Sequence, residues 1–180
     1  MEEDYLPQAY NLFQDVFGVG TETSSSTVEW AMSELLKNLR VMEKAQVEVR
    51  QVCNMKGNFN ETDLHELKYL KMVIKETLRV HPPYTFVASK GMWRKIPIDY
   101  NGTYFEYIPF GAGRRICPGI SFGLASVELA LAQLLFHFDW KFANGTKNED
   151  VDMAEALGVS SRRKRDLSLI AIAHRPLPSE

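Results

Sequence analysis

Four stretches of the chain have the polarity pattern of helices. In the first and third, apolar residues recur every three or four positions, whereas the second is rich in charge and the fourth is almost wholly apolar. We expect helices over Leu6–Leu39, Val41–Val52, Thr62–Val80 and from just after the cysteine at 117 to about Phe138. Pro82 and Pro83 end the third helix, because proline cannot continue one.

The remaining segments predict little regular structure. Asn54–Asn60 has the composition of a turn, Tyr84–Tyr107 is rich in Gly, Pro and aromatic residues, and Lys141–Gly158 is mostly loop. One strand is expected within Leu167–Ile172. Glycines and a run of hydroxyl residues over 18–27 predict a bulge or kink in the first helix. The fold class expected is mainly α with minor β.

Composition and charge argue against several classes of protein. A chain of 180 residues with 45% hydrophobic content is long enough for one domain with a core, and a net charge of -2 gives no indication of nucleic-acid binding. Cys53 and Cys117 lie far apart, which excludes a disulfide framework and suits a reducing compartment. Ile120–Phe138 is the most apolar stretch, but it carries Glu128 and His137, so we expect no transmembrane helix and no membrane anchor.

The stretch Phe110–Gly119, with sequence FGAGRRICPG, concentrates the candidate chemistry. It sets Cys117 in a glycine-rich turn just before an apolar helix, where the helix dipole favours a thiolate. Arg115 offers a positive fork for a carboxylate or phosphate. A soft anionic sulfur beside such an arginine suits a haem iron and its propionates.

This stretch resembles the haem-ligand loop of cytochrome P450s, Phe-x-x-Gly-x-Arg-x-Cys-x-Gly, at every defined position. The resemblance implies that Cys117 is the axial ligand of a haem b iron and the metal ligand of the chain. It further implies that Arg115 holds a propionate, Phe110 packs near the sulfur, and Gly113 and Gly119 let the loop approach the ring.

Other interpretations of the loop explain less. No Gly-Lys-Ser/Thr follows the glycines, so a phosphate-binding P-loop fails. A nucleophilic cysteine in a phosphate loop needs an arginine a few residues downstream, where this chain has Gly119 to Gly123. A small buried cysteine remains the ordinary alternative.

A second motif, Val19-Gly20-Thr21-Glu22-Thr23-Ser24, resembles the oxygen-binding signature of the same family except at its first position. The resemblance implies that Thr23 hydrogen-bonds bound dioxygen and that Glu22 helps to deliver protons, as adjacent carboxylates can. Val19 replaces Ala or Gly, and its branched side chain could crowd the oxygen site. A capping or packing irregularity is the alternative for such a hydroxyl run.

Glu76 and Arg79 stand three residues apart on one helix face and can pair. They resemble the Glu-x-x-Arg ion pair of the family, which a second arginine from a downstream Pro-Glu-Arg-Phe segment completes. That segment has no counterpart here, because the interval between Pro83 and Phe110 is several dozen residues shorter than in the family.

The resemblance covers almost the whole chain but only the C-terminal portion of the family fold. It implies a single incomplete P450 domain over 1–180, which divides into an oxygen-binding helix (1–40), the Glu-x-x-Arg helix (62–81), a shortened junction (84–107), the haem-ligand loop with its following helix (108–138), and a C-terminal loop and strand region (139–180).

The implied activity is that of a plant-type microsomal monooxygenase of specialised metabolism. It would insert one atom of dioxygen into a small lipophilic substrate of terpenoid or phenolic type, with electrons that NADPH supplies through NADPH-cytochrome P450 reductase. The family works on the cytosolic face of the endoplasmic reticulum; without an anchor, the expected location of this chain is cytoplasmic or unknown. The rival hypothesis is a truncated, inactive product that at most binds haem or acts as an interaction fragment.

The basic run at 162–165 has two interpretations. It could attract an acidic partner such as the reductase, but a solvated hairpin turn is the commoner explanation of such a run. The four histidines show no metal-ligand spacing, and Trp30, Trp93 and Trp140 are expected in or beside the core.

Overall fold

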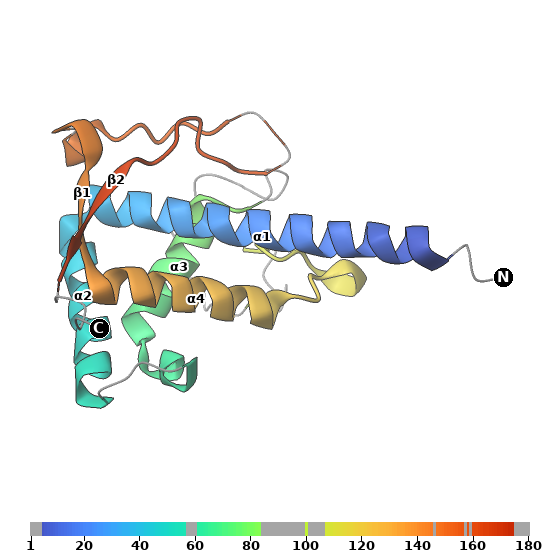
Figure 1. Cartoon of the computed structure of the whole chain (residues 1–180), viewed down its shortest axis with the longest axis horizontal. Coiled ribbons are helices and arrows are strands. Elements are labelled where there is room, and N and C mark those ends of the chain that lie inside the picture. The colour runs from blue at the N-terminus through green and yellow to red at the C-terminus, as the bar shows by residue number, and fades with distance from the viewer. Residues whose placement is uncertain are drawn as a thin grey trace.

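The fold is known from a computed structural model that describes residues 5–56, 61–83, 100, 107–145, 147–156, 158 and 160–174. Side chains are described from residue 17 onward, except at 54–56 and 144. Four helices dominate: α1 (Tyr5–Lys37), α2 (Leu39–Lys56), α3 (Lys68–Val80) and α4 (Ile120–His137). Short 3-10 turns lie at η1 (Glu61–Glu66), η3 (Gly113–Arg115), η4 (Ala143–Gly145) and η5 (Asn148–Asp150). Figure 1 shows α1 and α4 side by side, with α2 at one end of the pair and α3 crossing it. The mainly helical prediction is confirmed.

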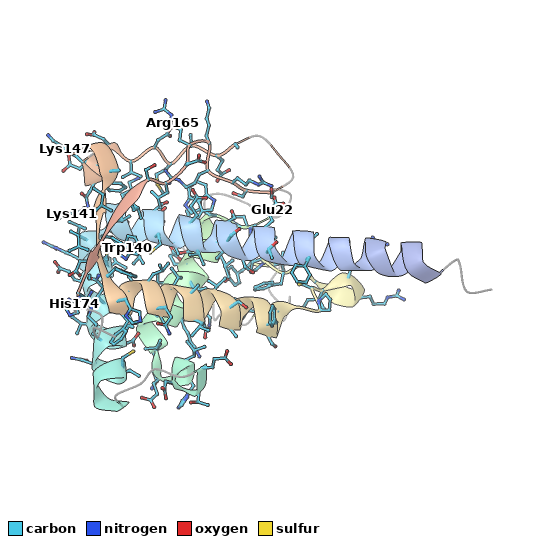
Figure 2. All side chains as sticks on the ribbon, viewed as in Figure 1. Glu22, Trp140, Lys141, Lys147, Arg165 and His174 are labelled. Carbon is cyan, nitrogen blue, oxygen red and sulfur yellow. The ribbon has the colours of Figure 1, made fainter. Side chains whose placement is uncertain are left out.

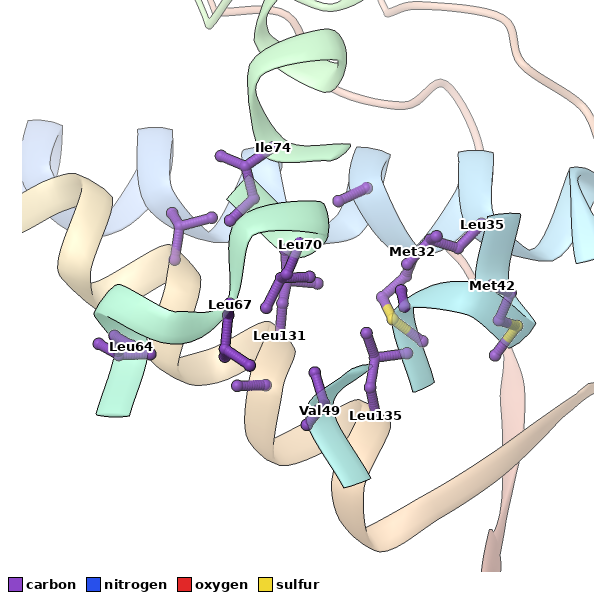
Figure 3. Close-up of a cluster of buried hydrophobic side chains, with 14 of the residues drawn as sticks. Met32, Leu35, Met42, Val49, Leu64, Leu67, Leu70, Ile74, Leu131 and Leu135 are labelled. Carbon is purple, nitrogen blue, oxygen red and sulfur yellow. The ribbon is translucent and has the colours of Figure 1, made fainter. Parts of the chain in front are cut away.

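The core lies where the four helices meet (Figure 3). Leu35 of α1, Val49 of α2, Leu70 of α3, and Leu131 and Leu135 of α4 are almost completely buried there. α4 contributes only a stripe, since Phe122 near its beginning is 81% exposed. The prediction of a buried helix is therefore right for one face of α4 and wrong for the other.

A two-stranded antiparallel sheet closes one end of the helices (Figure 1). β1 (Phe138–Phe142) pairs with β2 (Leu169–Ala173), with Phe138 opposite Ala173 and Phe142 opposite Leu169. The strand predicted within 167–172 is present, displaced by a residue or two. β1 was not predicted. A side chain of α2 contacts its first residue: the Arg50 Nη2 donates to the carbonyl of Phe138 at 3.2 Å.

α1 runs without interruption through the glycine and hydroxyl region (Figure 1), so the expected bulge or kink is absent. The hydroxyls bond back to carbonyls of their own helix: Thr21 donates to Phe17 at 2.6 Å and Ser24 to Gly20 at 2.9 Å. Because a carbonyl oxygen accepts two hydrogen bonds, these contacts add to the helical ladder without replacing it.

The third predicted helix is divided into η1 and α3, with Leu67 between them in a non-helical conformation. The division has a partner in α2: Glu48 accepts from the backbone N–H of Tyr69 at 2.8 Å and of Leu70 at 2.9 Å. A carboxylate there satisfies two otherwise free N–H groups and suits the positive end of the helix dipole. The helix ends at Val80, before Pro82, as predicted.

One further helix boundary differs from the prediction. Helix α2 continues to Lys56, so the turn expected from Asn54 begins later. The junction over 84–107 lies outside the described residues except for Tyr100 and Tyr107, and Trp93 lies outside them too.

By length and composition alone, α4 could also cross a membrane, since its mean hydropathy is 1.5. The sequence analysis did not expect this. In the structure, Val127 and Leu131 of α4 pack into the helical core, and Glu128 lies 3.7 Å from Lys71 of α3. These contacts are those of a packing helix within a domain.

Candidate functional site

The loop around Cys117 is closed by its own backbone. The Cys117 N–H donates to the carbonyl of Phe110 at 2.9 Å, and the Gly111 N–H to that of Ile108 at 2.9 Å. Gly111 and Gly113 have φ of 74° and 66°, in the left-handed region that disfavours side chains. The two glycines therefore let the chain turn back so that Cys117 lies beside the base of the loop.

Cys117 is an exposed, free thiol three residues before α4 begins. A Cβ on Gly119 would lie 3.8 Å from its Sγ, an ordinary van der Waals distance, so Gly119 lies directly beside the sulfur. The first turn of α4 leaves N–H groups without helical partners near this position, an environment that suits a negatively charged sulfur.

Cys53 provides a contrast. It is buried in the core, and burial, with a smaller contribution from the charge of Asp63, raises the pKa of its thiol to about 11. Cys53 is therefore a protonated core residue at neutral pH, and Cys117 is the cysteine available to a ligand.

The other loop residues lie as follows. Arg115 ends η3 with an exposed side chain, and among the described residues it has no hydrogen-bond or ion-pair partner. Phe110 is half-buried and meets the ring of Tyr100 edge-on, at 5.5 Å between ring centroids. Burial raises the pKa of the Tyr100 hydroxyl, as expected for a ring against apolar neighbours.

Glu22 and Thr23 lie on α1. The Thr23 Oγ1 donates to the carbonyl of Val19 at 2.8 Å. Glu22 points away from its helix toward the C-terminal segment (Figure 2), where Ser160 and Arg162 contact its carboxylate. Hydrogen bonds from Ser160 and then from Arg162 lower the pKa of the Glu22 carboxyl.

The two motifs lie on neighbouring helices (Figure 1): residues 19–24 are near the middle of α1, and the Cys117 loop comes just before α4, at the end of α4 remote from the sheet. Large apolar side chains are exposed on this part of α1 and at the beginning of α4: Phe17 is 58% exposed, Val19 52% and Phe122 81%. Such side chains offer apolar surface to a bound group or another part of a protein.

Glu76 and Arg79 of α3 form a bidentate ion pair. The Arg79 Nε donates to Glu76 Oε2 at 2.8 Å and the Nη2 to Oε1 at 2.6 Å. The hydrogen bond that it donates to Glu76 raises the pKa of the Arg79 guanidinium. The Glu76 side chain is 58% exposed, so solvent screens the pair.

A buried polar cluster was missed by the sequence analysis. The ring of His81 stacks on Trp30 at 3.8 Å between centroids, and the Arg163 guanidinium lies over Trp30 at 5.4 Å. His81 also contacts Glu34 at 2.9 Å. The solvated-turn interpretation of the basic run is wrong for Arg163, which is 9% exposed. Sequence offered little signal, because these residues are far apart in the chain.

Among the described residues, no group of three or more His, Cys, Asp or Glu could hold a metal ion. A metal at this site would therefore need to bring other ligands, as a haem iron does through its four ring nitrogens.

The family model for cytochrome P450 matches residues 9–99 and 93–168. The chain is 45% identical to melianol synthase CYP71BQ17 of Ailanthus altissima, over 95% of this chain and 41% of that protein. It is 46% identical to cytochrome P450 71D10 of Glycine max (92% and 40%), and 48% identical to tabersonine 16-hydroxylase 2 of Catharanthus roseus (87% and 39%). The chain thus spans about two fifths of the length of these relatives.

The alignments also contain a gap. Since 95% of 180 residues is about 171, the 211-residue alignment to melianol synthase has about 40 positions that this chain does not fill. The family model correspondingly matches in two parts that meet at 93–99.

Proposed function

This chain belongs to the cytochrome P450 family, and from that premise we propose that it carries the haem-binding part of a monooxygenase. The observation that carries the proposal is the exposed thiol of Cys117 in a closed, glycine-dependent loop at the beginning of α4. The reaction proposed is insertion of one atom of dioxygen into a small lipophilic substrate.

The residues present fit a haem. An exposed sulfur can approach an iron, Gly119 lies beside that sulfur, and the guanidinium of Arg115, which has no partner among the described residues, can donate hydrogen bonds to a propionate. Exposed Phe122 offers apolar surface at the same end of α4. A bound haem with a thiolate ligand supplies the oxygen-activating chemistry.

The protein residues then have separate tasks. Cys117 binds the iron, Arg115 orients the haem through a propionate, and Phe110 with Gly113 holds the shape of the loop. Thr23 offers a hydroxyl, and Glu22 a carboxylate, for moving protons along α1. Glu76 and Arg79 form a structural ion pair in α3.

The proposed substrate class and partner follow from the relatives. Their names describe melianol synthases, a tabersonine 16-hydroxylase, a tabersonine 6,7-epoxidase and a premnaspirodiene oxygenase. We propose a small lipophilic substrate of terpenoid or phenolic type for this chain. We propose NADPH-cytochrome P450 reductase as the electron donor and the cytosolic face of the endoplasmic reticulum as the location.

A catalytically inactive P450 product is the second candidate. It is favoured by the roughly 40 unfilled alignment positions and by the exposure of the Glu76–Arg79 pair, which the family completes with a further arginine. Such a chain would hold haem or a partner without turnover.

The test is turnover of the haem-loaded full chain with NADPH and a plant reductase, on a panel of terpenoids and phenolics under ¹⁸O₂. Product with one ¹⁸O atom, lost in Cys117→Ala and retained in Cys53→Ala, supports the monooxygenase. Haem binding without NADPH-dependent product supports the inactive alternative.

A further inference from the structure

The carboxylate of Glu22 is held by a segment that lies almost 140 residues later in the chain. Three side-chain contacts with this carboxylate converge on one oxygen, Oε1. The Ser160 hydroxyl donates to it, as do the Arg162 Nε at 2.9 Å and Nη2 at 2.6 Å. Among the described residues, Oε2 has no partner.

The segment that supplies these donors is anchored at its centre. Ser161, between the two donors, is 1% exposed, and its carbonyl accepts from Ser26 at 2.6 Å and from the indole of Trp30 at 2.9 Å. Its N–H donates to the carbonyl of Pro83 at 2.9 Å. Ser160 and Arg162 therefore flank a residue that is hydrogen-bonded to α1, and this anchor places both side chains beside Glu22.

The other two arginines of the basic run are engaged elsewhere. Arg163 lies 3.6 Å from Glu29 and over Trp30, and Arg165 lies 3.4 Å from Asp152. Within 162–165, Arg162 alone contacts Glu22 in the described structure.

We propose that Ser160 and Arg162 are positioning residues for Glu22, which fix Oε1 and leave Oε2 as the oxygen that exchanges protons. This inference rests on the proposed function. Glu22 would exchange a proton with solvent at Oε2 and return to the anion that Arg162 stabilises. The hydrogen bonds that lower the pKa of Glu22 are consistent with a residue that spends most of each cycle ionised.

The first arm of the test measures the contact itself. The carboxyl ¹³C resonance of Glu22, assigned with Glu22→Gln, is titrated in the full chain. Ser160→Ala and Arg162→Gln should each raise the pKa of Glu22, Arg162→Lys should raise it less, and the matched control Arg165→Gln should leave it unchanged. An unchanged pKa in Arg162→Gln would overturn the proposal.

The second arm uses the haem-loaded chain and the reductase. NADPH consumption in Arg162→Gln should fall about tenfold or more, with a larger solvent isotope effect and an acidic limb displaced to higher pH, because proton delivery becomes limiting. Arg165→Gln should match the wild type. A loaded chain with an unchanged isotope effect overturns the positioning role alone, whereas a chain that binds no haem overturns the proposed function as well.

Discussion

His81 lies flat against Trp30, with ring centroids 3.8 Å apart and ring planes 5° from parallel. The stack joins α1 to the end of α3, and the C-terminal segment joins it through Arg163 on Trp30. The Nε2 of His81 also meets the carboxylate of Glu34 at 2.9 Å. The ring stack and the contact of Arg163 with Trp30 thus connect three parts of the chain that are far apart in the sequence.

Replacing His81 should remove a pH-dependent contribution to stability. The hydrogen bond from His81 lowers the pKa of Glu34 below its usual 4.5. A lowered folded-state pKa stabilises the protein above the unfolded pKa, and that contribution is lost as pH falls through the folded value. His81→Phe keeps a ring on Trp30 but removes the hydrogen bond.

We therefore expect the stability difference between wild type and His81→Phe to be largest at pH 6–7 relative to pH 3, and to shrink as pH falls below about 4.5. Urea unfolding across this range measures it. A difference that grows toward acid pH would contradict the role given to Glu34.

The end of α2 and the beginning of α3 should be coupled through Glu48. Its carboxylate accepts from two backbone N–H groups of α3, so Glu48→Ala should cost about 1 kcal/mol of unfolding free energy, the typical loss for a helix cap. Glu43→Ala, an exposed change on the same helix, should cost less than about 0.5 kcal/mol. Equal effects of the two changes would show that Glu48 is not a cap.

The contact between Glu48 and the beginning of α3 is one that the sequence could not predict. The polarity pattern predicted α1, α2 and α4 to within a few residues at their ends: helical spacing for α1, a charged stretch for α2 and an apolar run for α4. It ran η1 and α3 together, because the break at Leu67 depends on Glu48, about twenty residues earlier in the chain. β1 was missed for a similar reason, since its pairing with β2 is a contact between distant segments.

The candidate site divides in the same way. The loop around Cys117 is local, so its residues could be named from sequence, and its left-handed glycines at 111 and 113 agree with the tight turn expected there. The partners of Glu22 could not be named, because Ser160 and Arg162 reach it only through the tertiary fold.

Substitutions on the buried and the exposed face of α4 should differ in their effect on the unfolding free energy. Leu131 is completely buried, so Leu131→Ala should lower the unfolding free energy by about 2–5 kcal/mol. Phe122 is 81% exposed, and Phe122→Ala should change the unfolding free energy of the haem-free chain by less than about 0.5 kcal/mol. Denaturant unfolding of both variants decides, and a large loss in Phe122→Ala would mean that this face is packed.

Glycine substitutions should distinguish the ligand loop from the helix. Gly113 has φ of 66° and no atom within 4 Å of an added Cβ, so Gly113→Ala should cost about 1–2 kcal/mol through backbone strain alone and weaken haem retention. Gly123 lies within α4 with equal space, and Gly123→Ala should instead stabilise by about 0.5–1 kcal/mol. Thermal unfolding and haem dissociation rates measure both, and stabilisation by Gly113→Ala would contradict the left-handed turn.

The most direct measurement is the reduced, carbon-monoxide difference spectrum of the full chain loaded with haem, compared with Cys117→Ala and Cys53→Ala. We predict a strongly red-shifted Soret band that persists in Cys53→Ala and disappears in Cys117→Ala, because only the exposed sulfur can bind the iron as a thiolate. A spectrum of non-thiolate haem that is the same in all three proteins would contradict the assignment of Cys117 as the haem ligand.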